Sequence, residues 1–117
     1  MDNILRKKDE QEVDSFPWGS LTWFARGSMG HEITLGFCRI ASGMSNPMHY
    51  HPNCTEILHV LSGTIMHSYE GREEMQMEAG DTITIESGKA HNARNVGDCE
   101  ALMSITFTTD DRKTVHI

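Results

Sequence analysis

The chain has 117 residues and a formal net charge of -7, with 17 acidic and 10 basic side chains. This length favours a single domain, and the excess of acid argues against a nucleic-acid partner, which would require a basic surface. The apolar runs are too short to span a bilayer, and the charged N-terminus lacks the apolar stretch of a signal peptide. We therefore expect a cytoplasmic protein with no membrane partner.

Residues 1–15 are rich in charge and poor in core-forming side chains, so we predict a flexible N-terminal arm there. Residues 16–117 contain short runs of β-branched and aromatic residues, separated by Gly, Asn, Asp and Ser. The predicted strands are, in chain order, 21–25, 32–40, 48–51, 56–61, 64–69, 74–78, 82–86, 91–96 and 101–108. About nine short strands without a sustained helical period are typical of one all-β sandwich or barrel.

Three histidines and one glutamate have a spacing that indicates a metal site. His49 and His51 are two residues apart, so in a strand they point to the same face. Glu56 follows after a turn, and His91 comes from a distant segment, as a site inside a barrel requires. These ligand types suit Fe, Mn, Ni, Zn, Co or Cu without selecting among them, and they leave coordination positions open for a substrate. We predict one divalent transition metal per chain.

The turn at Ser62-Gly63 predicts a hairpin between 56–61 and 64–69. A two-residue loop would place Tyr69 opposite Glu56 and His67 opposite Leu58, with both side chains pointing inward. Tyr69 is then a candidate catalytic residue that hydrogen-bonds Glu56 or a substrate, and His67 a candidate substrate-binding residue. The alternative for both is core filling, and a register shift of one residue would remove both from the pocket.

The spacing of glycines and ligands resembles that of the cupin family. The first cupin motif is complete, and its positions are Gly43, His49, His51, Glu56 and Gly63. The second motif is matched at Gly80, Gly88, His91 and Asn95. It departs from the family pattern at Glu86, which stands where the family has proline and which affects a turn rather than a ligand.

The resemblance implies a small antiparallel jelly-roll β-barrel that holds a divalent metal near one mouth. Its ligands would be His49, His51, Glu56 and His91. Single-domain cupins are often dimers, so a homodimer is expected. The aromatic cluster of Trp18, Trp23 and Phe24 is expected either to form the dimer interface or to cap the end of the barrel.

The fold and the metal site do not by themselves determine the reaction. The resemblance allows dioxygenases, decarboxylases, isomerases, lyases and non-enzymatic sensors of small ligands. Three histidines and one glutamate are the ligand set that cupin dioxygenases and oxalate-degrading cupins use with Fe, Mn or Ni. We favour a dioxygenase or a lyase/isomerase acting on a small polar organic molecule, with the metal as Lewis acid or redox centre. The alternative is a non-catalytic module that binds a small ligand.

Overall fold

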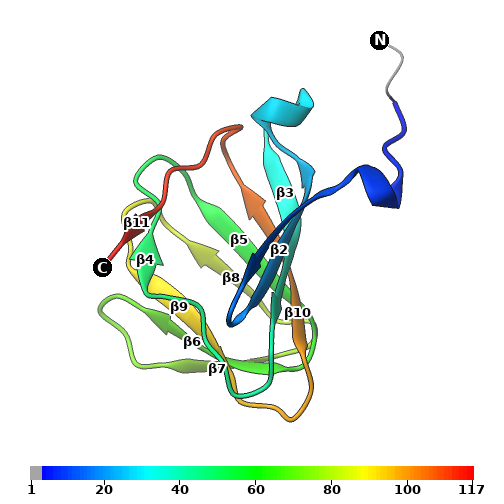
Figure 1. Cartoon of the computed structure of the whole chain (residues 1–117). Coiled ribbons are helices and arrows are strands. Elements are labelled where there is room, and N and C mark those ends of the chain that lie inside the picture. The colour runs from blue at the N-terminus through cyan, green and yellow to red at the C-terminus, as the bar shows by residue number, and fades with distance from the viewer. Residues whose placement is uncertain (1–3) are drawn as a thin grey trace.

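The computed structural model describes residues 4–117, and over this range the chain is almost entirely β (Figure 1). Two antiparallel sheets face each other, which confirms the predicted jelly-roll architecture. The larger sheet contains, in spatial order, β1 (Glu12–Phe16), β2 (Gly19–Ala25), β3 (Thr34–Ile40), β10 (Ala101–Phe107), β5 (Glu56–Ser62) and β8 (Thr82–Ile85). The smaller sheet contains β11 (Val115–His116), β4 (His49–Tyr50), β9 (His91–Asn95), β6 (Thr64–Tyr69) and β7 (Met75–Glu78).

The connections contain two short 3-10 helices, η1 (Lys8–Glu10) and η2 (Gly27–Met29). Each of the predicted strands is present, with ends within two residues of the predicted ones. β1 and β11 were not predicted, because their residues are mostly polar or exposed and carry no alternating apolar pattern. Within residues 4–117, neither helix has the length or apolar character needed to cross a membrane.

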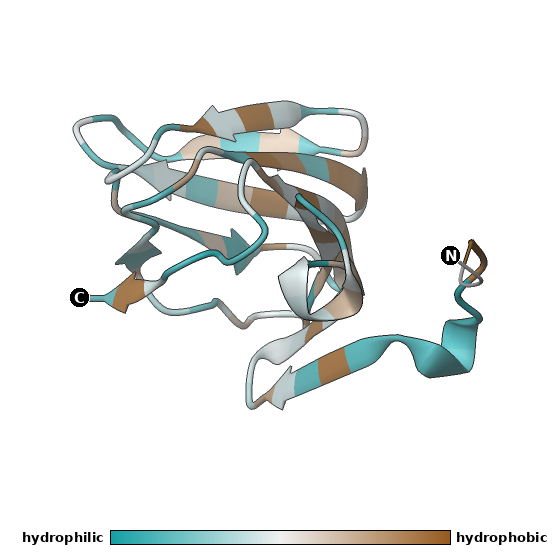
Figure 2. Ribbon diagram, turned by 90° about the horizontal axis from the view of Figure 1, so that it is seen from above, coloured by the Kyte–Doolittle hydropathy of each residue, from teal (hydrophilic) through white to brown (hydrophobic). Residues whose placement is uncertain are grey.

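The core lies between the two sheets and is built from alternating strand residues. β10, at the centre of the larger sheet, buries Ala101, Met103, Ile105 and Phe107 and turns the residues between them outward. The bands of hydrophobic and hydrophilic colour along the strands in Figure 2 show this alternation. Each fully buried large apolar side chain stabilises the fold by about 1.5–3 kcal/mol, so this packing fixes the strands that hold the site.

The N-terminal segment is partly integrated into the larger sheet. The predicted arm ended at residue 15, but that boundary falls inside β1, which pairs with β2 along its whole length. Two side-chain contacts hold this pairing: Trp23 Nε1 donates to Asp14 at 3.0 Å, and Arg26 Nε donates to Glu12 at 2.9 Å. These charged residues form sheet-edge contacts, which their composition alone did not indicate. Residues 4–11 extend away from the body (Figure 2).

The predicted hairpin between β5 and β6 is wrong, because the two strands belong to different sheets. β5 pairs with β10 and β8, whereas β6 pairs with β7 and β9. The chain crosses between the sheets at Gly63, whose φ is 92°. A side chain there would also be crowded, since a Cβ would lie 2.9 Å from Ala101 Cα. At Gly63 the chain therefore passes from one sheet to the other, whereas the sequence predicted a reversal within one sheet.

Candidate metal centre

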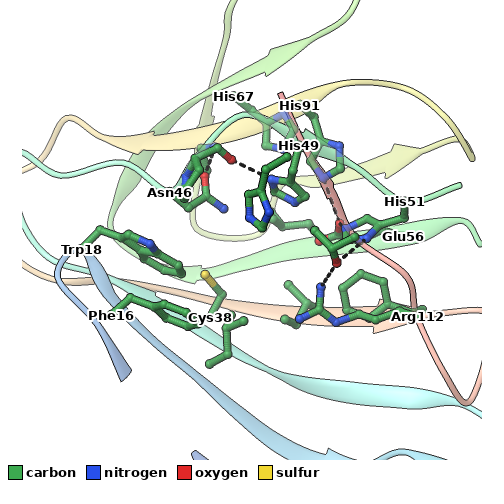
Figure 3. Close-up of a pocket in the computed structure, with 18 residues that line it drawn as sticks. Phe16, Trp18, Cys38, Asn46, His49, His51, Glu56, His67, His91 and Arg112 are labelled. Atoms are coloured by element: carbon green, nitrogen blue, oxygen red, sulfur yellow. Dashed lines mark hydrogen bonds and ion pairs between the residues drawn. The ribbon is translucent and has the colours of Figure 1, made fainter. Parts of the chain in front are cut away.

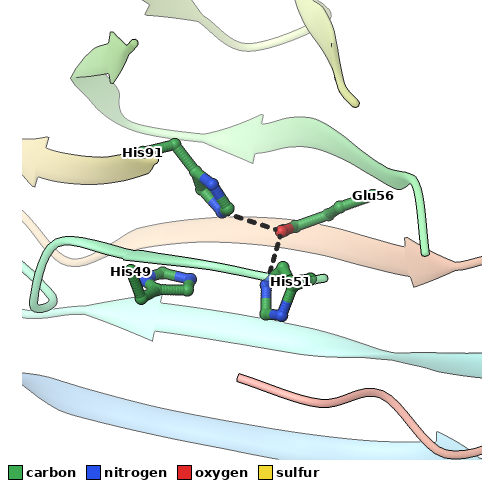
Figure 4. A group of neighbouring side chains, drawn as sticks. All are labelled: His49, His51, Glu56 and His91. Atoms are coloured by element: carbon green, nitrogen blue, oxygen red, sulfur yellow. Dashed lines mark hydrogen bonds and ion pairs between the residues drawn. The ribbon is translucent and has the colours of Figure 1, made fainter. Parts of the chain in front are cut away.

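The four predicted ligands converge between the two sheets (Figure 4). His49 lies on β4 and His51 directly after it, while Glu56 begins β5 and His91 begins β9. The pairing of β4 with β9 places His49 directly opposite His91. One ligand atom from each of the four residues lies within 4.8 Å of the others. Residues up to 42 positions apart in the chain thus form one compact group that spans both sheets.

Backbone carbonyls fix the orientation of all three imidazole rings. In each ring Nδ1 contacts a carbonyl oxygen, at 2.7 Å for His49 and at 2.9 Å for His51 and His91. The three carbonyls belong, in that order, to Pro47, Lys113 and Lys89. A carbonyl can only accept, so Nδ1 is the donor in each ring, and a neutral ring then carries its free lone pair on Nε2. This is the arrangement by which proteins orient metal-binding histidines.

The imidazole lone pairs and the Glu56 carboxylate lie so close together that a cation, a proton or a metal ion, is needed between them. Nε2 of His91 lies 3.1 Å from Oε1 of Glu56, and Nε2 of His51 lies 3.3 Å from the same oxygen. Nε2 of His51 is buried and has no hydrogen-bond partner among the described residues. Neutral imidazole lone pairs facing a carboxylate repel unless a proton or a metal ion lies between them. The spread of the ligand atoms is close to twice the metal–ligand distance of about 2.0–2.2 Å, so the donor set fits a divalent metal.

The pKa shifts within the group also follow from this convergence. Burial alone would raise the pKa of Glu56, but the adjacent imidazoles of His51 and His91 outweigh it and hold that pKa well below its usual range. For His91, burial opposes protonation, yet the hydrogen bond with Glu56 prevails and raises the pKa. Burial lowers the pKa of His49 to about 4. Without metal, the group therefore keeps an ionised carboxylate and favours a proton on His91.

The group opens into a cavity of about 230 Å³ between the sheets (Figure 3). Figure 3 shows Phe16, Trp18 and Cys38 at one end of the labelled residues and Arg112 at the other. The rings of Phe16 and Trp18 stack with their centroids 4.8 Å apart. The remaining apolar wall comes from Leu21, Leu58, Ala93, Ile105 and Phe107. Ligand sites in proteins share this character, an apolar wall with a few convergent polar groups.

The structure brings only one of the other two predicted site residues to this cavity. His67 lines it, is fully buried, and has no hydrogen-bond partner for either ring nitrogen among residues 4–117. Its inward position arises from the pairing of β6 with β9 and not from the predicted hairpin. Tyr69 pairs with His91 along the strands but lines a separate depression, with the Arg72 guanidinium 6.0 Å from its ring. Tyr69 therefore lies outside the metal cavity.

The aromatic cluster is also divided by the fold. Trp18 lines the metal cavity, whereas Trp23 is fully buried in the core. Phe24 packs edge-to-face against Phe37, with ring centroids 4.6 Å apart. Trp18 thus contributes to the cavity wall and Trp23 to the core.

The segment 110–116, here called the C-terminal strap, completes the site and was missed from the sequence. It adds Arg112, Thr114 and His116 to the cavity lining. Asn53 clamps it from both sides: its Nδ2 donates to the Asp111 carbonyl at 2.9 Å, and its Oδ1 accepts from the Lys113 amide at 2.9 Å. No sequence motif marks the strap, because its contacts join residues about 60 positions apart in the chain.

Asn46 is a further cavity residue that the sequence did not indicate. Its Oδ1 accepts from the Ala93 amide at 2.8 Å, and its backbone carbonyl accepts from Asn92 Nδ2 at 3.1 Å. These bonds fix the amide group beside His49 (Figure 3). The useful signal was its place three residues before His49, inside the first motif.

Two facing antiparallel sheets with an interior cluster of three histidines and one glutamate define a metal-binding jelly-roll protein. The cupin domain family matches residues 36–107, and the chain belongs to this family. Among curated proteins it is 32% identical over 92 residues to germin-like protein 3-5 of Oryza sativa subsp. japonica, covering 73% of this chain and 40% of that protein. It is 29% identical over 102 residues to oxalate oxidase 1 of Hordeum vulgare, covering 81% and 50% respectively.

Solved structures show the same fold. An oxalate oxidase in complex with glycolate superposes with a TM-score of 0.83 and 25% identity, over 99% of this chain and 64% of the other. A double-stranded β-helix protein from Klebsiella pneumoniae gives a TM-score of 0.79 at 16% identity, over 98% of this chain and 92% of the other. The chain spans half or less of the length of the two curated relatives above.

Proposed function

We propose that the protein is a metal-dependent enzyme that acts on a small carboxylate related to oxalate. The observation that carries this proposal is the buried Nε2 of His51, which lies 3.3 Å from Glu56 Oε1 and has no hydrogen-bond partner among residues 4–117. A site built only for stability would not leave converging lone pairs at the edge of a cavity. Kinship with oxalate oxidases supports a carboxylate substrate.

In the proposed enzyme the four ligands hold the metal, and other cavity residues hold the substrate. When bound, the metal would supply a Lewis acid or redox centre with open coordination positions. Asn46 offers its side-chain Nδ2 as a donor, because its Oδ1 already accepts from the chain. His67 supplies ring nitrogens with no partner among the described residues. These groups would orient a carboxylate or hydroxyl oxygen by hydrogen bonding.

The apolar wall has a separate role in this proposal. Stacked Phe16 and Trp18 and the buried Leu58 give the cavity an apolar lining, which limits the approach of water. Interactions between charges are stronger where water is excluded, so the wall strengthens the attraction between an anionic substrate and the metal. It would also shield a reactive intermediate from solvent.

The first test is elemental analysis of the anaerobically purified protein, with the His91→Ala variant beside it. We expect about one transition metal per chain in the wild type and a loss of that metal in the variant. Equal metal content in the two proteins would refute the ligand assignment. Metal content alone does not identify the reaction, so substrate turnover is measured next.

The metal-loaded protein is then incubated with oxalate, with and without dioxygen. Formation of hydrogen peroxide and carbon dioxide would identify an oxidase, and formation of formate and carbon dioxide a decarboxylase. Tight binding of small carboxylates without turnover of any of them would favour the alternative, a non-catalytic ligand-binding module. One observation favours this alternative. Glu56 is the one carboxylate that lines the cavity among residues 4–117, so if it binds the metal no second carboxylate remains to act as a base.

We also propose a homodimer formed through the larger sheet. β1 lies at the edge of that sheet and exposes Val13 and Phe16, whose relative accessibilities are 57% and 41%. An exposed edge strand with apolar side chains readily pairs with another chain. Light scattering coupled to gel filtration should give twice the monomer mass, and Val13→Lys should reduce it toward the monomer. A monomeric wild type would refute the proposal.

A further inference from the structure

Arg112 is a charged side chain in the cavity wall that the metal group does not use. It comes from the C-terminal strap and lies near His51 and Glu56 (Figure 3). Besides Glu56, it is the one lining residue in the described part of the chain that carries a fixed charge at neutral pH. Its position therefore affects which ligands the cavity accepts.

The guanidinium of Arg112 has unused hydrogen-bonding capacity. Nη1 donates to Thr114 Oγ1 at 2.9 Å, and among residues 4–117 no other acceptor is found for its five N–H groups. No carboxylate oxygen of these residues lies within 4.0 Å of it. Arg26, which follows β2, and Arg39, on β3, differ in this respect, since Arg26 pairs with Glu12 and Arg39 with Glu100.

Two aromatic rings hold the guanidinium in place without neutralising it. Its Cζ atom lies 4.7 Å from the ring centroid of Trp23 and 5.0 Å from that of Phe107. Both rings are buried, so they exclude water from the cation. Burial lowers the pKa of Arg112, which shows that the surroundings disfavour its charge. An anion in the cavity would relieve this cost through charge-assisted hydrogen bonds.

The charge balance of the loaded cavity also favours an anion. The carboxylate of Glu56 offsets one charge of a divalent metal, and within residues 4–117 no second acidic side chain lines the cavity to offset Arg112. A site with an excess positive charge and an apolar wall is suited to a small organic anion. A neutral ligand of equal size would leave the guanidinium uncompensated.

We propose that Arg112 is the residue that selects a carboxylate anion over a neutral ligand in this cavity, by binding the carboxylate through its free N–H groups. The inference rests on the proposed function, because it names the contact that recognises the substrate's charge. The planar fork of arginine matches a carboxylate in two parallel hydrogen bonds, which a lysine cannot make.

The test compares glycolate with its neutral analogue glycolamide, by calorimetric titration into protein saturated with Mn(II). The variants are Arg112→Gln and Arg26→Gln. Arg26 is a matched control, because its guanidinium also lies over the Trp23 ring, at 5.4 Å, but does not line the cavity. Metal content is measured for each protein, so that a loss of metal is not mistaken for a loss of anion binding.

We expect the wild type to prefer glycolate, and Arg112→Gln to lower glycolate affinity by about 10–100-fold while glycolamide affinity stays unchanged. Arg26→Gln should keep the wild-type preference. The proposal is overturned if Arg112→Gln keeps that preference, or if the wild type binds glycolate no better than glycolamide. If Arg112→Gln does not fold, Arg112→Lys replaces it, and unchanged glycolate affinity in that variant overturns the proposal.

The inference and the proposed function fail in different ways. Glycolate binding that depends on Arg112, without turnover of any carboxylate, supports the inference and refutes the enzyme. Turnover of oxalate with a KM that Arg112→Gln leaves unchanged supports the enzyme and overturns the inference.

Discussion

His67 lies almost parallel to His91 in the cavity wall, with ring centroids 5.8 Å apart and planes inclined by 9°. The two rings differ in their hydrogen bonding. His91 uses both nitrogens, on the Lys89 carbonyl and on Glu56, whereas neither nitrogen of His67 has a partner among the described residues. Burial lowers the pKa of His67 to about 4. A buried polar group without a partner costs free energy of folding, and its retention at a cavity indicates a function.

His67→Leu should therefore stabilise the metal-free protein by about 1–3 kcal/mol, because it replaces unpartnered polar atoms by an apolar side chain of similar size. The variant should keep its metal, since His67 is not one of the four ligands. Urea denaturation of the metal-free variant and wild type at neutral pH measures the difference. A destabilised variant would show that His67 makes stabilising interactions, for example with bound water. The conservative control is His67→Gln, which keeps a polar side chain.

The stability of the metal-free protein should fall as the pH decreases. The pKa values of His49 and His67 are lowered from 6.5 to about 4, so between these values the unfolded chain binds protons that the folded chain does not. Below this range Glu56 adds to the loss, because its lowered pKa stabilises the fold only while the carboxylate is ionised. Urea midpoints measured between about pH 6 and pH 4 test the trend, because the raised pKa of His91 acts in the opposite direction only above this range. A constant midpoint over this range would contradict it.

Metal binding near neutral pH should release protons. The raised pKa of His91 retains a proton on the metal-free group, and a metal can only bind the deprotonated ring. Calorimetric titration of Mn(II) in two buffers with different ionisation enthalpies measures this release. Equal heats in the two buffers would show that the metal displaces no proton. The His91→Ala variant, which should not bind the metal, gives the blank heat of titration in each buffer.

His51→Ala and His91→Ala should each abolish stable metal binding and leave the β fold intact. Both histidines lie at the cavity and outside the apolar core that joins the sheets. Metal analysis of both variants tests the loss of metal, and far-UV circular dichroism tests whether the β fold is kept. Full metal content with unchanged affinity in either variant would refute its role as a ligand.

Asn53→Ala should weaken metal binding although Asn53 does not touch the metal group. The substitution removes the two hydrogen bonds that clamp the C-terminal strap, whose Lys113 carbonyl orients His51. Loss of such outer contacts lowers metal affinity by about 10–100-fold. Competition with a fluorescent chelator measures the affinity. Asn53→Asp keeps the acceptor for the Lys113 amide, so its metal affinity should fall less than that of Asn53→Ala. Equal losses of metal affinity in both variants would contradict this role of the Asn53 hydrogen bonds.

Local spacing was sufficient to predict the strands and the convergence of the four candidate ligands. Turn residues and alternating apolar residues determine where the strands lie, and the separation of His49 from His51 determines a shared face. The motif carried His91 as well, although it lies 35 residues from Glu56. These features depend on short-range chain geometry, which follows directly from the spacing of residues in the sequence.

Long-range pairing was not predictable in the same way. Ser62-Gly63 is compatible with a hairpin and with a crossing between sheets. Which of the two forms depends on the strands that β5 and β6 pair with, and these come from distant parts of the chain. The wrong choice placed Tyr69 beside Glu56, whereas the structure places it outside the cavity. Arg112 and Thr114 were missed for a related reason, because they reach the site through tertiary contacts and carry no motif.

The C-terminal strap has a consequence for the order of events during synthesis. All four ligands are translated by residue 91, but the carbonyl that orients His51 belongs to Lys113, and β4, which carries His49, also pairs with β11. While residues 110–116 are still inside the ribosome, the emerging chain holds its ligands without their final orientation. High-affinity metal uptake should therefore follow the emergence of this segment from the ribosome and not precede it.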